Sequence, residues 1–275
     1  YEICACLVGS EMCIRDSYYM LRRQDLQFAR SSFRLAAVFG MIATLMTIQM
    51  GDESGYLVTK DQPTKIAAME AIWETHEAPA PLTLFAIPDE AAQMNHAQID
   101  LPWLFGLMGT RSLSTEIPGI KELTAQAEQR IVNGQKAVGV LDQLRKDPSN
   151  EQLREQFLAV RDDLGFGLLL KRYTNDVTTA TPEMIKQAAA DTIPSVTPMF
   201  WSFRIMVGSG LAMALVFVLG LFYSFRKEIA DKTWYLRLAV LALPLPWIAS
   251  EAGWFVAEFG RQPWTIYNVL PTHLS

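Results

Sequence analysis

The feature that most constrains this chain is a long stretch without any charged side chain, from Ile205 to Phe225. A membrane-spanning helix needs about 20 consecutive apolar residues, and soluble domains rarely contain such a run. Arg226 and Lys227 end the stretch with two positive charges. The sequence therefore predicts a transmembrane helix over residues 199–225.

Two further apolar stretches lie near the ends of the chain. Residues 35–50 carry no charge, and the polar sequence GDESG at 51–55 is expected to end that helix. Residues 238–259 form the third stretch, in which Pro244 and Pro246 predict a kink. The predicted fold class is an all-α integral membrane protein with three transmembrane helices and a long, partly helical extracytoplasmic loop.

Basic residues orient these helices. Arginines cluster in residues 22–34, and basic residues recur in 226–237, so the positive-inside rule places both segments in the cytoplasm. The expected organisation is a cytoplasmic flank and helix at 18–50, an extracytoplasmic loop at 51–198, a helix at 199–225, a cytoplasmic loop at 226–237, a helix at 238–259 and an extracytoplasmic segment at 260–275.

The loop has its own predicted structure. Helical patterns cover residues 64–75, 117–145, 151–164 and 181–193, with Pro63 and Thr181 as starting signals. The short apolar pieces at 82–87 and 99–105 are interpreted as strands or as segments lying on the membrane.

Residues 1–17 are a separate case. The sequence YEICACLVGSEMCIRDS has no helical or strand period and holds all three cysteines, Cys4, Cys6 and Cys13. It resembles a translated sequencing-adapter tail, so we expect it to be non-native and the chain to be a fragment that lacks both ends. The net charge of −5 does not suggest a nucleic-acid partner.

Charged residues within or next to the spans are the first candidates for function, because an unpaired intramembrane charge costs several kcal/mol. Arg204 lies near the start of the second span, and Glu251 and Glu258 share one face of the third. The two carboxylates can form a proton path or bind a cation. The plainer interpretations are an arginine that reaches the headgroups, a solvated helix end at Glu258, and simple packing for Met206.

Lys65 and Glu70 are the second set of candidates, on the predicted helix 64–75. At a spacing of five they are not a standard helix-surface ion pair, and a solvated face is the simpler explanation from the residues alone. Together on a polar ligand they can donate and accept protons. The three histidines, His76, His96 and His273, all lie outside the spans.

Six motifs, in order, resemble subunit I of the cytochrome bd quinol oxidases over residues 18–272. They are GDESGY at 51–56, KIAAME at 65–70 followed by WET at 73–75, GFGLLLKRY at 165–173, FRIM at 203–206, PLPW at 244–247 and EAGWFVAEFGRQPW at 251–264.

The resemblance implies a quinol:oxygen oxidoreductase of the bacterial inner membrane. In that family quinol is oxidised at a periplasmic "Q loop", here 51–198, and electrons pass through haem b558 to haem b595 and haem d, where dioxygen is reduced to water. Turnover generates a proton-motive force. The implied partners are ubiquinol or menaquinol, dioxygen, oxidase subunit II, a small accessory subunit and membrane lipid. The long loop favours ubiquinol.

The resemblance also implies site residues. Met206 resembles the axial ligand of haem b558, and Arg204 the arginine beside it. Glu258 resembles the carboxylate at haem b595, with Trp254 and Arg261 as its neighbours. Lys65 and Glu70 resemble the quinol-oxidising pair. The resemblance assigns no role to Glu251, for which a proton relay remains the candidate role. The site residues by type are catalytic Lys65 and Glu70, iron ligands Met206 and Glu258, and haem-binding Arg204, Trp254 and Arg261.

The same resemblance makes the three spans the sixth to eighth of the family's nine. The family's histidine ligands lie in earlier spans, so the fragment alone is expected to be inactive. Two other functions remain open from the residues: a membrane receptor with an extracytoplasmic sensor loop, and a proton-coupled transporter subunit that uses Glu251 and Glu258. A haem difference spectrum separates them from an oxidase.

Overall fold

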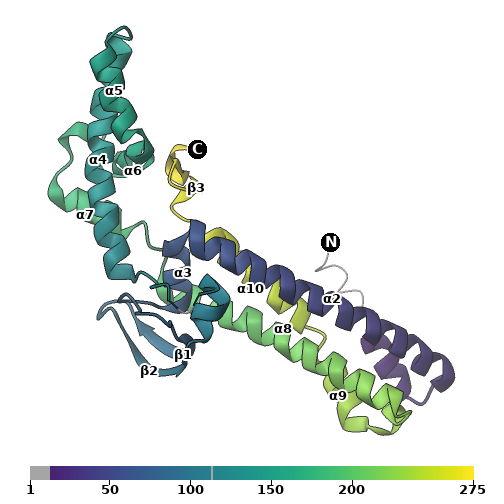
Figure 1. The fold of residues 1–275 in the computed structure, drawn as a ribbon. Coiled ribbons are helices and arrows are strands. Elements are labelled where there is room, and N and C mark those ends of the chain that lie inside the picture. Colours follow the sequence, from purple (N-terminus) through teal and green to yellow (C-terminus); the bar gives the residue numbers. More distant parts are fainter. Residues whose placement is uncertain (1–12, 113) are drawn as a thin grey trace. The chain divides into compact units, whose positions relative to one another are not determined.

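The computed structural model describes residues 13–112 and 114–275 (Figure 1). The chain divides into two units, which are taken separately here. The first, the membrane unit, comprises Tyr1–Gly55 and Trp201–Phe255, and the second, the loop unit, comprises Tyr56–Phe200 and Val256–Ser275.

Among the described residues, three helical stretches are long and apolar enough to cross a membrane: Leu26–Asp61, Val196–Phe225 and Thr233–Phe259. The first is α2 (Leu26–Asp61) and the second is α8 (Val196–Phe225). The third is broken into α9 (Thr233–Leu241) and α10 (Leu245–Phe259) beside Pro244, which confirms the predicted kink. The predicted fold class, an all-α membrane protein with three spans, is confirmed.

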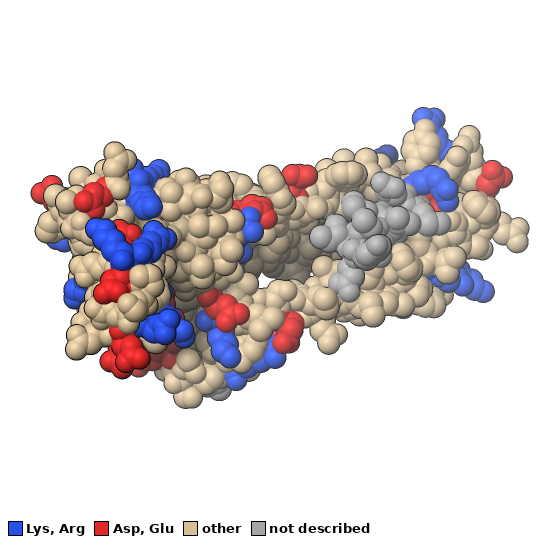
Figure 2. All heavy atoms as spheres, turned by 90° about the horizontal axis from the view of Figure 1, so that it is seen from above, with Lys and Arg blue, Asp and Glu red and all other residues tan. Residues whose placement is uncertain are grey.

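The outward faces of these helices are apolar. Exposed leucines include Leu35 on α2, Leu211 and Leu215 on α8, and Leu241 on α9, at 56–75% exposure. Figure 2 shows a broad stretch of surface with hardly any charged side chain. Exposed apolar surface on this scale suits contact with lipid or other membrane helices better than contact with water.

Small residues let the helices of the membrane unit approach closely. A Cβ at Gly220 would lie 2.4 Å from the Tyr235 hydroxyl oxygen, and one at Gly40 would lie 2.5 Å from the Phe217 ring. The Tyr235 hydroxyl donates to the Val216 carbonyl at 2.9 Å. This combination of glycines and a satisfied buried polar group is typical of helix packing in membranes.

The segment expected to be non-native falls largely outside the described residues. Residues 13–21 are helical, and Cys13 and Met20 lie in the same apolar cluster as Tyr235. Residues 1–12 are not described, so the expectation for 1–17 stays a prediction.

The predicted end of the first helix is wrong. The sequence GDESG at 51–55 was expected to stop it, but α2 continues to Asp61. A change from apolar to polar side chains does not interrupt backbone hydrogen bonding, and each glycine lowers helix stability by only about 1 kcal/mol. The chain leaves the helix at Gln62, before Pro63 begins α3 (Pro63–Glu70).

The described residues of the loop unit form four more α-helices and two hairpins. The predicted helices at 117–145 and 181–193 are confirmed as α4 and α7, and Thr181 caps α7 by accepting from the Met184 amide. The helix expected over 151–164 ends at Val160, and α3 ends at Glu70 because Ala71 is left-handed (φ 53°). The α-helices and strands are α4 Ile120–Lys146, α5 Glu151–Val160, α6 Leu164–Leu169, α7 Pro182–Ala190, β1 Leu82–Asp89, β2 Met94–Leu101, β3 Trp264–Ile266 and β4 Leu270–Pro271. The short helical turns of this unit are η1 Gly106–Thr110, η2 Arg161–Asp163, η3 Leu170–Arg172, η4 Val177–Thr179 and η6 Thr272–Leu274. A further short turn, η5 Ile229–Asp231, belongs to the membrane unit.

The two apolar pieces of the loop pair as strands. β1 and β2 form an antiparallel hairpin in which Leu82 lies opposite Leu101. Its second strand begins at Met94, five residues before the predicted piece at 99–105. Of the two interpretations, strands or segments lying on the membrane, the structure therefore has strands.

The core of the loop unit lies around α4. Helices α5, α6 and α7 pack on it (Figure 1), and Ile131 of α4 and Leu170 are completely buried. Where α4 crosses α6, Gly134 and Gly167 bring the two backbones together.

This crossing gives a test of the packing. A Cβ at Gly134 would lie 2.2 Å from the Gly167 nitrogen, and backbone atoms cannot move aside easily. Gly134→Ala is therefore expected to destabilise the loop unit by about 1–3 kcal/mol. Gly139→Ala is the matched control on the same helix, since its nearest neighbour is Thr178 Cγ2 at 3.6 Å. That change should be neutral, or stabilising by up to about 1 kcal/mol. Urea-dependent proteolysis of the loop in the intact protein measures both. Equal effects of the two substitutions would contradict the packing.

Candidate functional site

Lys65 is the best-defined of the predicted site residues. It lies in the first turn of α3, partly buried, and its Nζ donates to the Ala257 carbonyl at 3.5 Å. A Cβ at Gly260 would lie 3.0 Å from Lys65 Cε, so the absence of a side chain there leaves room for the lysine stem. The structure thus brings α3 against the end of α10, 192 residues away in the chain.

Two more predicted residues lie at this end of α10. Arg261 donates to Glu258 at 2.5 Å, and both side chains are nearly half exposed. Both charges act on Lys65. Burial lowers the pKa of the Lys65 ammonium, Glu258 opposes that change, and Arg261 adds to it. The sequence treated Lys65 as part of a quinol pair and Glu258 as a haem residue, and the structure puts them in one charged cluster.

Glu70 closes the same short helix but has different surroundings. It is only 3% exposed, whereas Lys65 is partly exposed. The segment after it is fixed by the β1–β2 hairpin, because the Asn95 side chain donates to the Ala71 carbonyl at 2.9 Å and accepts from the Trp73 indole at 2.8 Å. Glu70 is therefore a buried carboxylate on a well-anchored segment.

Met206 lies on α8, against α10. Its sulfur lies 3.0 Å from the position that a Cβ on Gly253 would take. One helical turn further along α8, a Cβ at Gly210 would have no heavy atom within 4 Å. Arg204, two residues before Met206, places its guanidinium 5.5 Å from the centre of the Phe203 ring. The Met206 thioether thus fits beside α10 because Gly253 has no side chain, and the space near Gly210 on its own helix is open.

Glu251 and Trp254 lie on the outer surface of α10. Glu251 is exposed, and Trp254 is 66% exposed. Trp247, four residues before Glu251, is 55% exposed, and the spacing 247, 251, 254 places the three side chains on one face of the helix. A carboxylate within an apolar span is costly in lipid, so this face is expected to meet protein or a polar path.

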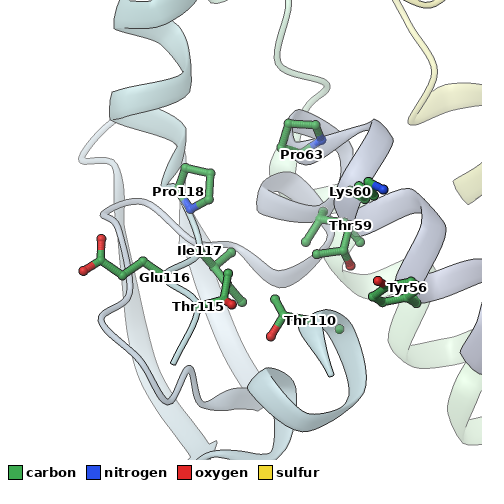
Figure 3. Close-up of a pocket in the computed structure, with 11 residues that line it drawn as sticks. Tyr56, Thr59, Lys60, Pro63, Thr110, Thr115, Glu116, Ile117 and Pro118 are labelled. Atoms are coloured by element: carbon green, nitrogen blue, oxygen red, sulfur yellow. The ribbon is translucent and has the colours of Figure 1, made fainter. Parts of the chain in front are cut away.

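A cavity lies in the loop unit, beside the helix that carries Lys65 but not at Lys65 itself (Figure 3). Its volume is about 220 Å³, and neither Lys65 nor Glu70 lines it. Figure 3 shows Tyr56, Thr59 and Lys60 on the end of α2, across from Thr110 and Thr115. The remaining lining residues are Pro63, Ile66, Gly109, Glu116, Ile117 and Pro118. The cavity therefore offers a second location for a small ligand of this unit.

Sequence reasoning missed several residues that contact α3. The hydroxyl groups of Thr64 and Tyr267 are hydrogen-bonded at 3.3 Å, and the Ala257 carbonyl accepts from Lys65. Tyr267 lies outside all six motifs. The only local signal is its position after the buried Trp264 and before Asn268, which takes a left-handed turn conformation (φ 61°).

The donor residues fit two of the three haems that the family resemblance implies, haem b558 and haem b595. Met206 supplies a soft thioether beside open space, and Glu258 supplies a carboxylate that accepts a hydrogen bond from Arg261. In residues 13–112 and 114–275, no group of three or more His, Cys, Asp or Glu side chains is placed to hold a metal.

The fold places the chain in the class of α-helical integral membrane proteins. Comparison with known proteins gives the family. A profile described as "Cytochrome bd terminal oxidase subunit I" matches residues 3–275. The chain belongs to this family. The match begins within the segment expected to be non-native, which the described structure leaves undecided.

Curated relatives agree with the family. Subunit 1 of the cytochrome bd-II ubiquinol oxidase of Escherichia coli (strain K12) is 40% identical over 257 residues, 94% of this chain and 50% of that protein. Subunit 1 of the cytochrome bd ubiquinol oxidase of Bacillus subtilis (strain 168) is 27% identical over 259 residues, 94% of this chain and 43% of that protein. The chain therefore spans about half the length of these relatives.

The solved structure of bd oxidase from Geobacillus thermodenitrificans has the same fold. The TM-score is 0.63 at 20% sequence identity, over 98% of this chain and 49% of that chain. The helical architecture is thus that of a bd oxidase.

Proposed function

We propose that this chain is part of subunit I of a membrane-bound quinol oxidase that reduces dioxygen to water. The observation that supports the proposal best is 40% identity to a ubiquinol oxidase subunit over 94% of the chain. The chain covers half of that relative, so the activity is proposed for the full-length subunit with its partners. These are a second oxidase subunit and a small accessory subunit.

The proposed quinol site is at α3. Oxidation of a quinol releases two electrons and two protons, so the site needs a group that holds the quinol oxygen and a group that takes a proton. Lys65 can donate a hydrogen bond to that oxygen, since its stem is already fixed along Gly260. Glu70, as a buried carboxylate, can accept a proton directly or through water. Ubiquinol is the favoured substrate, with menaquinol as the alternative.

The orientation follows from the basic segments and the positive-inside rule. The loop 51–198 and the segment 260–275 lie on the periplasmic side of a bacterial inner membrane, and 226–237 is cytoplasmic. Protons released from quinol in the loop are then released outside the cell membrane, and oxidase turnover generates a proton-motive force. In the family arrangement the three spans are helices six, seven and eight.

The proposed cofactor-binding residues lie on α8 and at α10. Met206 would bind the iron of haem b558 through its thioether sulfur, with Arg204 beside it. Glu258 would be a ligand at haem b595, with Trp254 and Arg261 as neighbours, and haem d would complete the set. Bound haems supply one-electron transfer and dioxygen reduction. The chain's own residues would supply one donor atom for haem b558 and one for haem b595, with an arginine near each.

The deciding experiment is a reduced-minus-oxidised absorption spectrum of membranes that contain the full-length subunit with its partner subunit, together with oxygen uptake driven by ubiquinol. Absorption bands of b- and d-type haem and quinol-dependent oxygen uptake are expected. A spectrum without either band, in membranes that contain the assembled protein, would end the oxidase proposal.

Glu251 is proposed as a proton relay. Glu251→Gln keeps hydrogen bonding but removes the titratable proton, so oxygen-reduction turnover is expected to fall about 100-fold or more, with haem content unchanged. Ile248→Val, a neighbouring exposed position on α10, is the matched control and should leave turnover unchanged. Steady-state oxygen uptake and haem quantification measure both. Full turnover in Glu251→Gln would remove the relay role.

A further inference from the structure

The short length of α3 raises the question of what fixes its position. It has only eight residues, and isolated helices shorter than about 12 residues are marginal in water. Tertiary contacts must therefore fix it. At its C-terminal end these contacts come from the loop itself, where the Ile120 and Lys121 amides donate to the Ile72 and Trp73 carbonyls at 2.8 and 3.1 Å.

The N-terminal end of α3 is held by a different part of the chain. The Thr64 hydroxyl is hydrogen-bonded to the Tyr267 hydroxyl, and the neighbouring Lys65 donates to Ala257. Both partners belong to the stretch that runs from the last turn of α10 into the β3–β4 hairpin. The turn of α3 that carries Lys65 is therefore contacted by residues about 200 positions later in the chain.

The hairpin is in turn held firmly by α6. Trp264 is 2% exposed, and its ring centre lies 5.0 Å from that of Phe166. A Cβ at Gly165 would lie 2.2 Å from the Asn268 carbonyl oxygen, so the hairpin backbone touches the helix backbone. Tyr267 packs at 6.2 Å from Trp264, ring centre to ring centre. Packing against Trp264 therefore fixes the position of the Tyr267 ring independently of the hydrogen bond to Thr64.

The Tyr267 hydroxyl keeps its proton at this location. Burial raises the pKa of Tyr267, against the smaller lowering effects of the Thr64 hydrogen bond and Arg130. A protonated phenol can both donate and accept, which suits a hydroxyl–hydroxyl contact. Because the Tyr267 ring is held by packing, its hydrogen bond to Thr64 fixes the first turn of α3. The short helix does not fix the tyrosine.

We infer that Tyr267 is a positioning residue for the quinol reaction, which acts through Thr64 to hold the turn of α3 that carries Lys65. The inference rests on the proposed role of Lys65 in quinol binding. It adds that the β3–β4 hairpin, through Tyr267 and Thr64, sets where the Lys65 ammonium lies. The hairpin thus ties the loop helices α4 and α6 to the quinol-binding turn.

The test uses Tyr267→Phe and Thr64→Val in the full-length oxidase, with steady-state kinetics on a soluble ubiquinol analogue. Each change removes one hydroxyl and keeps the side-chain shape. Each single variant should raise the KM for quinol about two- to tenfold, the range expected from one hydrogen bond. The haem spectrum and the oxygen KM should be unchanged. The double variant should be no worse than either single one, because both remove the same contact.

Tyr173→Phe is the matched control. It removes the hydrogen bond that another tyrosine of the loop unit donates to Asp191. Tyr173 follows α6 in the chain, at the end of the short turn η3. It should leave the quinol KM unchanged. An equal rise in all three tyrosine and threonine variants would indicate a general loosening of the loop and overturn the inference.

Two other outcomes also overturn it. One is an unchanged quinol KM in both Tyr267→Phe and Thr64→Val while Lys65→Ala impairs quinol oxidation, which leaves the proposed function standing. The other is loss of haem in Tyr267→Phe, which indicates a role in assembly. If Lys65→Ala itself has no effect, the proposed quinol site fails first, so the two failures are distinguishable.

Discussion

Met206→Leu is expected to abolish the low-spin b-type haem signal of the full-length oxidase. Leucine keeps the apolar volume next to Gly253 but has no sulfur to bind iron, and a thioether is a soft ligand suited to haem iron. With the Met206 thioether lost, quinol-driven oxygen uptake should fall to background, while the d-type band remains. The measurement is a reduced-minus-oxidised spectrum of solubilised complex, normalised to protein.

Met213→Leu is the control for this prediction. Met213 lies on the same helix, seven residues later, and packs against the apolar cluster of α2 and α9. Its replacement by leucine conserves volume and is expected to cost less than about 1.5 kcal/mol without any change in the spectrum. A Met206→Leu protein with an intact low-spin band would remove the ligand assignment and return Met206 to ordinary packing.

Local sequence patterns predicted the elements of this fold well where one physical rule decides the structure. The apolar stretch before Arg226, the break at Pro244 and the cap at Thr181 all correspond to features of the structure. The end of α2 was predicted wrongly, because the change in side-chain polarity at 51–55 was read as a helix end. Side-chain polarity indicates whether a helix lies in lipid or in water. A proline such as Pro63 acts on the backbone itself, because it cannot donate a helical hydrogen bond.

The site could be predicted only residue by residue. Lys65 and Glu258 were both chosen from the sequence, but no pattern placed them in one charged cluster, because that contact joins positions 65 and 257–261. Tyr267 was not chosen at all. Its importance comes from Trp264 and Gly165, which fix the hairpin, and packing between distant segments has no local signal.

Lys65→Ala is expected to lower kcat/KM for ubiquinol by a factor of about ten to a hundred, the effect of losing a hydrogen bond from a charged donor of about 1.5–3 kcal/mol. The lysine stem runs along Gly260, and its Nζ is already within 3.5 Å of the Ala257 carbonyl, so the ammonium position is fixed before substrate arrives. The b- and d-type haem bands should be unchanged. Quinol titration of oxygen uptake, with the spectrum recorded on the same sample, measures both.

Lys60→Ala separates the two locations at which quinol can bind. Lys60 is only five residues earlier and lines the cavity of about 220 Å³, which Lys65 does not. If quinol binds at the first turn of α3, Lys60→Ala leaves kcat/KM near its original value and Lys65→Ala does not. The reverse result would move the site to the cavity and leave Lys65 with the structural role of pairing α3 with the end of α10. Loss of all haem in Lys65→Ala would also support that structural role. The lysine would then be needed to keep α3 against the end of α10 and not to bind the substrate.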